Sequence, residues 1–463
     1  MQRLLAISFL TLRAAIRYKL VVALAVLLIG TVVVLPLIII DDSTARGFTQ
    51  ILLTYTLSAI TAILGFATLW LACGTLAREI EECQMQVVAT KPIARWQIWA
   101  GKWLGIMILN GALLALSGAA VYGLLLYRAK KLPVAQQEVL RKEIFVARGG
   151  IKERPVDISA DVEQIFRERI KKAPVSPAEY GQLRAQIAEF VKAQFQIVRP
   201  NYGRGWHIDL GSLKDSLRDQ PLYLRVRFSI SEQYHDADNP KNYPTVWYVG
   251  VPESGRVRAQ TLSLASDTFH EIEIPPNMFD DKGVLTIECL NNSEADMLFL
   301  LDNGMEVLYR EASFGVNFFR GMVIIAFWLG LLAAMGLAAA SFLSFPVASF
   351  LALGILIVSF STGTLSQVVE EGGVSGVNHD TGRIEVPRMI DQVVVPVFAG
   401  MLKLVKMVRE FTPIDSLSSG RSITWPQLAW AFLQIVVVTG GCFSLFGIIM
   451  FTRRELATAQ GNQ

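Results

Sequence analysis

Long apolar runs alternate with polar stretches along the chain, and this pattern is the first guide to the fold. The hydrocarbon core of a bilayer takes about 20 residues of α-helix to cross. We expect six membrane spans, over residues 18–40, 51–75, 103–127, 318–342, 347–365 and 428–451. No Asp, Glu, Lys or Arg lies at the centre of any of these runs. Ion-coupled transporters normally carry ionisable groups inside the membrane, so the pattern argues against that class.

The residues before the first run combine apolar positions at helical spacing with arginines between them. The apolar positions are Leu5, Phe9, Leu12 and Ile16, and the basic ones are Arg3, Arg13 and Arg17. This pattern favours a helix lying in the headgroup layer, with a plain basic tail as the alternative. The first run is too long for the apolar part of a signal peptide, and no small-residue cleavage site clearly follows it. We therefore interpret it as a retained membrane anchor.

Basic residues near the ends of the runs predict the orientation of the chain. They cluster before the first run, between the second and third, and after the sixth, at Arg13, Arg17, Lys19, Arg78, Lys91, Arg95, Lys102, Arg453 and Arg454. An even number of spans places the three clusters on one side, which the positive-inside rule identifies as the cytoplasm. Arg128, Lys130 and Lys131 then fall outside, where they open a long external segment in which charge has less influence on topology.

A long polar segment, residues 128–317, lies between the third and fourth runs and is interpreted as an external α+β domain. Its first part, 133–198, has charged stretches with spaced apolar residues and prolines between them, which is typical of helices. Its second part, 204–311, has short alternating segments separated by turn residues, which favours an antiparallel β-sandwich. The expected strands are 222–230, 245–251, 256–264, 268–274, 283–290, 297–301 and 305–310.

A second external segment, 367–426, precedes the last run. Part of it, 389–411, is apolar but interrupted by charge, because Lys403, Lys406 and Arg409 recur every three residues. We expect a re-entrant or interfacial helix here, with a soluble helix packed on the β-domain as the alternative.

The predicted fold is therefore an α-helical polytopic membrane protein of six transmembrane helices with an inserted α+β extracytoplasmic domain that contains an antiparallel β-sandwich. The boundaries follow from the runs. They are 1–127 for the N-terminal helix and three spans, 128–317 for the external domain, 318–366 for two further spans, 367–426 for the second external segment, and 427–463 for the last span and tail.

The segment between the second and third runs, residues 77–102, carries the most specific pattern in the chain. It combines an acidic cluster, a Thr-Lys-Pro-Ile-Ala-Arg turn at 90–95, and a Gly-Lys-Trp-Leu-Gly entry into the third run at 101–105. Pro92 fixes a turn and presets the start of a helix. A permease that is driven by a cytoplasmic ATPase needs a stiff, charged element that is joined to two spans and through which the ATPase can move them. An ordinary cytoplasmic loop that obeys the positive-inside rule would explain the basic residues. It would explain neither the acidic cluster nor the order in which the acidic cluster, the turn and the Gly-Lys segment follow one another.

In these residues the chain resembles the type-two ABC exporter permeases, over roughly residues 1–127 and 318–455, whereas the large external domain departs from minimal members of that family. The resemblance implies a subunit in the bacterial inner membrane, with both termini cytoplasmic, that exports its substrate. It implies a homodimer, or a heterodimer with a similar permease, and separate ATPase subunits that carry ATP and Mg²⁺. The uncharged spans favour a hydrophobic or amphipathic cargo. The coupling residues it implies are Glu79, Glu81, Glu82, Lys91, Pro92, Arg95, Trp96, Gly101 and Lys102. Of these, Arg95 and Lys102 are expected to hold phospholipid headgroups or acidic residues of the ATPase.

Composition narrows the function further. Of the 463 residues, 52% are hydrophobic, and the mean hydropathy is +0.41, which is too apolar for an ordinary soluble protein. A net charge of +3 gives no case for nucleic-acid binding. The chain contains no GxxxxGK[ST], HExxH or GxSxG motif, and its four cysteines and four histidines form no metal-ligand pattern. We therefore expect no catalytic residue, metal or cofactor in this chain.

Aromatic residues of the β-region suggest a second candidate site. Trp206, Tyr234, Trp247 and Tyr248 could form a platform for a sugar or peptide, because this region loosely resembles jelly-roll carbohydrate-binding modules. The alternative is that these rings fill the sandwich core. A binding platform would suit the alternative function of the whole chain, a membrane-anchored external binder or sensor without transport activity.

Overall fold

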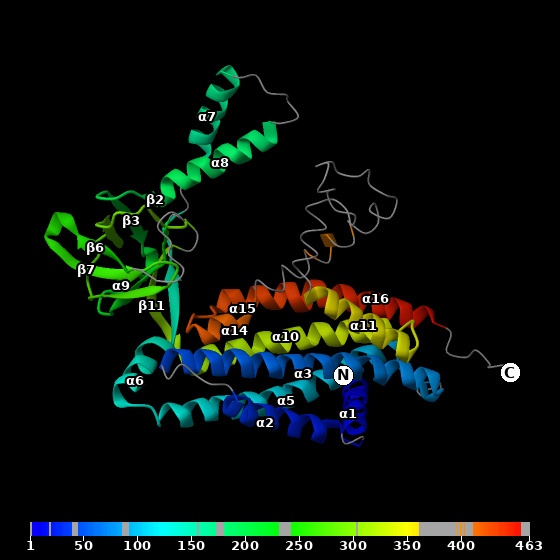
Figure 1. The fold of residues 1–463 in the computed structure, drawn as a ribbon. Helices are drawn as coiled ribbons and strands as arrows, with labels where there is room; N and C mark the ends of the chain where they lie inside the picture. Colours follow the sequence, from blue (N-terminus) through cyan, green and yellow to red (C-terminus); the bar gives the residue numbers. More distant parts are fainter. Residues whose placement is uncertain are drawn as a thin grey trace. The chain divides into compact units, whose positions relative to one another are not determined.

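The computed structural model of this protein divides into two compact units. One is formed by Met1–Ala147 together with Ala312–Gln463, and the other by Arg148–Glu311. The residues that the structure describes are 2–17, 20–38, 45–85, 92–154, 157–172, 180–230, 242–301, 304–360 and 411–454, with 396, 399, 400 and 402 in addition. The first unit is helical and the second consists of β-sheets with a helical hairpin (Figure 1).

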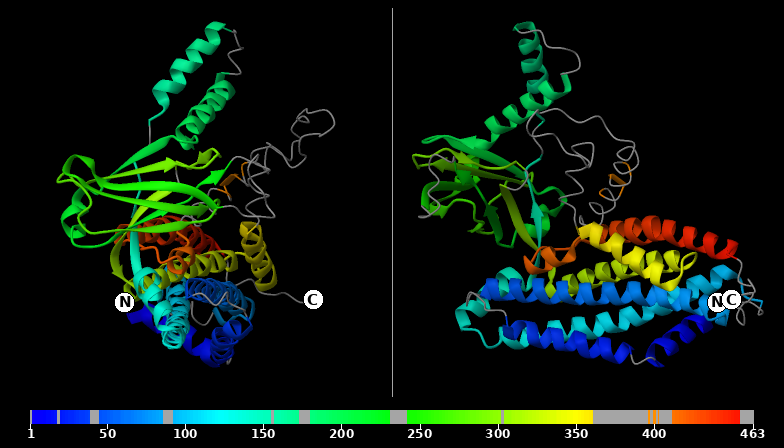
Figure 2. Two further views of the ribbon diagram at one scale, coloured as in Figure 1. Left: turned by 60° about the vertical axis from the view of Figure 1, so that its left-hand side comes forward. Right: turned by 45° about the vertical axis from the view of Figure 1, so that its right-hand side comes forward.

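Long helices lying side by side make up the helical unit (Figure 2). In chain order they are α1 (Gln2–Arg17), α2 (Leu20–Ile38), α3 (Ala45–Glu81), α5 (Arg95–Ala129), α10 (Phe314–Ala340) and α11 (Phe345–Phe360), followed by the continuous stretch of α15 (Trp425–Ala431), the π-helix η6 (Phe432–Gly440) and α16 (Gly441–Arg453). Shorter elements are α6 (Val134–Val139), the π-helix η1 (Leu140–Ile144) and α14 (Pro413–Ser418).

Within the described residues, four helices are long and apolar enough to cross a membrane. They are Thr49–Glu81, Arg95–Ala129, Phe314–Ala340 and Trp425–Arg453. The pair Gln2–Arg17 and Val21–Pro36, bent by 69°, makes a fifth if it counts as one span, and Phe345–Gly354 is a shorter apolar helix. These helices are compatible with a membrane protein, and the count of six spans stays a prediction.

Helix α10 is the central element of the helical unit. Buried side chains of α10 pack with those of α3, α5, α11 and α16. Small residues allow the closest approach: a Cβ atom added at Gly336 would lie 2.7 Å from Cβ of Ala72 on α3. Small residues at helix contacts are the usual solution for helices in membranes, because backbones can then approach closely.

The segment before the last helix packs into the same core. Phe411, Leu417 and Ile423, around α14, are buried against α3 and α10. The side chain of Asn317 on α10 fixes this segment, because its amide nitrogen donates to the carbonyl of Arg421 (2.7 Å) and its oxygen accepts from the main-chain N–H of Ile423 (2.8 Å). The helix predicted over 389–411 falls almost entirely outside the described residues.

Two four-stranded sheets form the β-region of the second unit. One has the order β1 (Val146–Ile151), β11 (Met305–Ser313), β4 (Leu222–Val226), β8 (His270–Ile274), and the other has the order β3 (Gly203–Asp209), β9 (Val284–Asn291), β6 (Asn242–Val251), β7 (Arg256–Ala265). A small sheet joins β2 (Ile197–Val198), β10 (Met297–Leu298) and β5 (Ser229–Ile230). The paired strands β4, β6, β8, β9 and β11 are antiparallel, and buried residues of both large sheets share one hydrophobic core.

The sequence located most strands but placed the start of the unit too early. Strands β4 to β11 lie within or beside the expected segments, whereas β1 and β2 fall in the part that was predicted to be helical, and β3 precedes the first expected strand. Residues 128–147 belong to the helical unit, so the second unit begins at Arg148 rather than at Arg128. Helix α5 continues to Ala129, and α6 and η1 continue the helical structure to Ile144. The charged residues that follow residue 127 had indicated the start of the external domain instead.

A helical hairpin completes the second unit. Helices α7 (Ser159–Lys172) and α8 (Tyr180–Gln196) agree with the expected helices and pack through Phe166, Ile187 and Val191. The guanidinium of Arg184 lies 4.3 Å from the ring centroid of Phe166 and 3.3 Å from a carboxylate oxygen of Glu163, which ties the two helices together. The short helices η3 (Gly211–Leu213), α9 (Lys214–Leu217) and η5 (Pro252–Ser254) connect strands.

Candidate functional site

The candidate site is the connection between α3 and α5, at one end of the helical unit. The sequence predicted a loop over 77–102, but α3 continues to Glu81 and α5 begins at Arg95, so half of this segment belongs to the two long helices. Figure 2 shows α1, the turn between α10 and α11, and the end of α16 at the same end of the unit.

Lys102 joins the start of α5 to the end of α3. Its side chain is only 3% exposed, and its Nζ lies 2.6 Å from Oε1 of Glu79 and 2.9 Å from the carbonyl oxygen of Thr75. A buried ammonium group is tolerated only where a counter-charge and hydrogen bonds replace its water. The carbonyl oxygen of Thr75, on α3, is the second acceptor for the ammonium group of Lys102. Lys102 therefore links α5 to α3 through an ion pair and a hydrogen bond.

Arg95 makes a second tie, to the end of α16. Its Nη1 donates to the carbonyl oxygens of Phe451 (2.9 Å), Thr452 (2.8 Å) and Arg454 (2.8 Å). The last carbonyls of a helix have no partner within the helix, so a guanidinium that reaches them stabilises its end. Arg454 continues the chain of contacts, because its Nη1 lies 3.3 Å from the carbonyl oxygen of Ser341, just after α10.

Two glycines of α5 provide the surface on which α1 lies. A Cβ atom at Gly101 would lie 2.8 Å from the side chain of Ile7, and one at Gly105 would lie 2.7 Å from the carbonyl oxygen of Ser8. The hydroxyl of Ser8 donates to the carbonyl of Gly101 (2.9 Å), and a guanidinium nitrogen of Arg3 donates to the carbonyl of Pro92. This is the close helix contact that a Gly-x-x-x-Gly spacing permits.

The last turn of α3 holds the start of α11. The carboxylate of Glu81 accepts a hydrogen bond from the main-chain N–H of Phe345 at 2.8 Å. This N–H is the first of α11 and has no partner within the helix, and the positive end of the helix dipole favours the carboxylate there. One turn earlier on α3, the guanidinium carbon of Arg78 lies 4.1 Å from the ring centroid of Phe345.

The predicted coupling residues therefore separate into two groups. Glu79, Glu81, Arg95, Gly101 and Lys102 make contacts within the helical unit, and so does the main-chain carbonyl of Pro92, whereas the side chains of Glu82 and Trp96 are exposed. Trp96 is 51% exposed, and the carboxylate of Glu82 accepts a hydrogen bond from the side chain of Gln84 (2.6 Å). Lys91 lies outside the described residues. Arg95 and Lys102 both make contacts within the helical unit, and the expectation that they hold lipid headgroups or acidic residues of a partner stays a prediction.

The tryptophans of the predicted ligand platform lie in the sandwich core. Trp206 and Trp247 are buried, with ring centroids 6.2 Å apart and planes at 17°, and Nε1 of Trp247 donates to the hydroxyl of Thr245 (2.9 Å). Tyr248 points to the other face of β6 and is 37% exposed, as strand alternation requires. Tyr234 lies outside the described residues. Since the two indole rings present no open surface, they do not form a platform.

Some contacts of the site had a signal in the sequence and others did not. The spacing of Gly101 and Gly105 is visible in the sequence and indicates a close helix contact. The contacts of Arg95 with α16 and of Glu81 with α11 join residues far apart in the chain, and no local pattern announces them. Over the part of the chain that the structure describes, no group of His, Cys, Asp and Glu is arranged to hold a metal ion.

Comparison with models of known protein families, with curated proteins and with solved structures found no match to this chain.

Proposed function

We propose that this chain is the membrane-spanning permease subunit of an ATP-binding-cassette transporter, driven by a separate ATPase subunit. The observation that supports the proposal is the number of helices joined to one short connection. Lys102 ties α5 to α3, Arg95 ties it to α16, Gly101 seats α1, and Glu81 holds α11. A force applied at this connection is therefore passed directly to most of the helical unit.

The exposed residues of the connection are the ones available to a partner. Glu82 offers a carboxylate and Trp96 a large amphipathic ring, on either side of the turn that contains Pro92. Large aromatic side chains are enriched where proteins bind one another. In the proposal, the ATPase contacts this surface, and its closure on ATP moves α3 and α5 together because the Lys102–Glu79 pair couples them.

The remaining parts of the proposal follow from topology and from the family resemblance. The connection faces the cytoplasm of a bacterial cell, ATP and Mg²⁺ bind on the ATPase, and the permease works as a homodimer or as a heterodimer with a similar chain. The charged ties lie near the ends of their helices, and the long runs between them are apolar. A hydrophobic or amphipathic substrate, exported from the cytoplasmic side, suits such helices better than a free ion does.

The test is purification of the tagged full-length chain from its native membrane, with identification of what accompanies it by mass spectrometry. We expect a stoichiometric ATPase subunit, and we expect the double variant Glu82→Lys, Trp96→Ala to lose it. The matched control is Glu138→Lys, Trp430→Ala, which alters exposed residues away from the connection and retains the ATPase. Arg95 is unsuitable for this test, because replacing it removes contacts within the unit.

Co-purification of envelope proteins or glycans, with no nucleotide-binding subunit in either preparation, would contradict the proposal. That outcome would favour a membrane-anchored external binder or sensor.

A further inference from the structure

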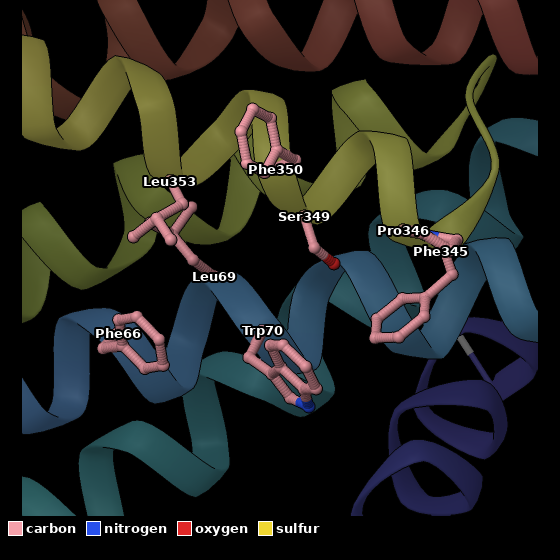
Figure 3. A pocket seen from close by; sticks show the side chains of 8 residues that line it. All are labelled: Phe66, Leu69, Trp70, Phe345, Pro346, Ser349, Phe350 and Leu353. Carbon is pink, nitrogen blue, oxygen red and sulfur yellow. The ribbon is translucent and has the colours of Figure 1, made fainter.

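An apolar groove runs between α3 and α11 on the side of the helical unit (Figure 3). It has a volume of about 280 Å³. Phe66, Leu69 and Trp70 of α3 line one wall, and Phe345, Phe350 and Leu353 of α11 line the other. Ser349 is the polar residue of the lining, and its hydroxyl lies beside the apolar walls.

The groove opens outward from helices that are apolar enough to lie in a membrane. Phe350 is 81% exposed and Trp70 is 47% exposed, although both belong to strongly apolar stretches. Exposed aromatic rings of this kind on a soluble protein would mark a binding surface. On a membrane helix they face hydrocarbon, so the natural occupant of the groove is an acyl chain.

One end of the groove is marked by a positive charge. Phe345, which forms this end, packs edge-on against Trp70 with ring centroids 5.2 Å apart. The guanidinium carbon of Arg78 lies 4.1 Å from the centroid of the same Phe345 ring. Arg78 is exposed and makes no ion pair with any residue that the structure describes, and the nearby carboxylate of Glu81 is engaged by the main-chain N–H of Phe345.

We propose that this groove binds one phospholipid of the leaflet on the side of the α3–α5 connection, with an acyl chain between α3 and α11 and the phosphate on Arg78. The apolar walls match the chain, and the guanidinium at the end matches the negative charge of the headgroup. Arginine binds phosphate well because its planar donors match the phosphate oxygens. The lipid is a resident component and not the transported substrate, and its binding does not depend on the ATPase.

The charge at the groove end makes a prediction about lipid selectivity. Each basic residue near a membrane surface attracts anionic lipid with an energy that corresponds to a preference of about fivefold. Phosphatidylglycerol carries a net negative charge and phosphatidylcholine does not, so the groove should prefer phosphatidylglycerol by about this factor.

The test is photo-crosslinking of the full-length chain without an ATPase, in lipid nanodiscs of phosphatidylcholine and phosphatidylglycerol. A benzophenone amino acid replaces Phe350 in the groove, and mass spectrometry identifies the lipid adducts. The control probe replaces Leu445 on α16, which is also exposed but does not line the groove. We expect phosphatidylglycerol adducts at position 350 to be enriched about fivefold over the bilayer composition, and adducts at position 445 to follow that composition.

Variants of Arg78 complete the test. Arg78→Gln should abolish the enrichment at position 350, whereas Arg78→Lys should keep part of it and Arg17→Gln, at another exposed arginine, should keep all of it. Adducts at position 350 that follow the bulk composition in every variant would overturn the proposal. Adducts with a second copy of the chain would overturn it in favour of a subunit interface. Either failure would leave the proposed partnership with an ATPase untouched.

Discussion

Cationic side chains make different kinds of contact in the two units of this protein. In the sandwich they pair with carboxylates: Arg148 lies 2.8 and 3.2 Å from the two carboxylate oxygens of Glu271. At the α3–α5 connection, Arg95 contacts main-chain carbonyls of α16, and Lys102 contacts a carbonyl as well as Glu79. The difference lies in what each contact joins. Arg148 and Glu271 belong to one sheet, whereas the cations of the connection join separate helices.

This contrast indicates two mechanical roles. Pairs within a sheet, such as Arg225 directly opposite Glu306, stabilise a single rigid body. Contacts between helix ends instead join separate helices. In the proposed function, the connection passes movement from one helix to the next, and the sandwich stays a rigid body. The following predictions test this distinction, from the largest expected effect to the smallest.

The core of the sandwich should be the most sensitive place in the second unit. Trp247→Ala removes a fully buried ring that contacts Trp206 and Phe299, so we expect a loss of about 3–5 kcal/mol in stability. Tyr248→Ala, one residue further on the exposed face, should change stability by about 0.5 kcal/mol or less. Chemical denaturation of the full-length chain, followed by tryptophan fluorescence and circular dichroism, measures both. Equal losses for the two variants would contradict the assignment of Trp247 to the core.

The pair of Glu79 and Lys102 should behave as a unit. Glu79→Leu leaves the buried ammonium group with a carbonyl but no counter-charge, and we expect a loss of about 3 kcal/mol. The double variant Glu79→Leu, Lys102→Met removes both charges and should recover most of that loss. Unfolding in detergent micelles measures the cycle. Additive losses in the double variant would show that the two side chains do not interact.

The packing of α1 on α5 should depend on Gly101 and Gly105. Gly105→Leu places atoms where Ser8 of α1 lies, so we expect α1 to detach, at a cost of about 1–3 kcal/mol. Trypsin should then cleave after Arg13 and Arg17 much faster. Gly111→Leu is the matched control, because a side chain there meets nothing within 4 Å. Equal cleavage of the two variants would contradict the packing of α1 on α5.

Cys289 should show the smallest effect. Burial raises the pKa of its thiol from 9.0 to about 12, so the folded chain keeps it protonated where an unfolded chain would ionise. Unfolding then releases a proton above pH 9, and this residue lowers stability as pH rises from about 9 to 12. Maleimide at pH 8 should label the exposed Cys83 and leave Cys289 unmodified until the protein unfolds. Labelling of Cys289 in the folded chain would contradict its burial.

The sequence predicted the local elements well and the contacts between them poorly. Apolar runs and strand alternation located α3, α5, α10 and β4 to β11, because these patterns reflect which face of an element is buried. The sequence did not predict the internal contacts of Arg95 and Lys102, because a charged residue near a predicted membrane end is as suited to a headgroup as to a helix end. Only the packing of α16 against α5 shows which of the two Arg95 contacts.

The aromatic residues show the same limit. A tryptophan in an alternating strand fits both a core and a platform, and the register of β6 with β9 decides that Trp247 lies opposite the buried Cys289, on the inner face. Strand β1 was missed because Gly149 and Gly150 interrupt its pattern. At Gly149 the absence of a side chain makes room for the ring of Tyr309. Such requirements come from the partner strand and are not visible in the segment itself.

The most direct test of the central claim is a photo-crosslinker at position 96, in place of the exposed Trp96, in cells that express the full-length chain at its native level. The account predicts an adduct with an ATP-binding-cassette subunit, at a yield that changes with the nucleotide state of that subunit. A probe at Trp430, on α15 and equally exposed, should give no such adduct. If position 96 yields only lipid, or the same proteins as position 430, then this connection does not receive an ATPase and the chain is not the permease proposed here.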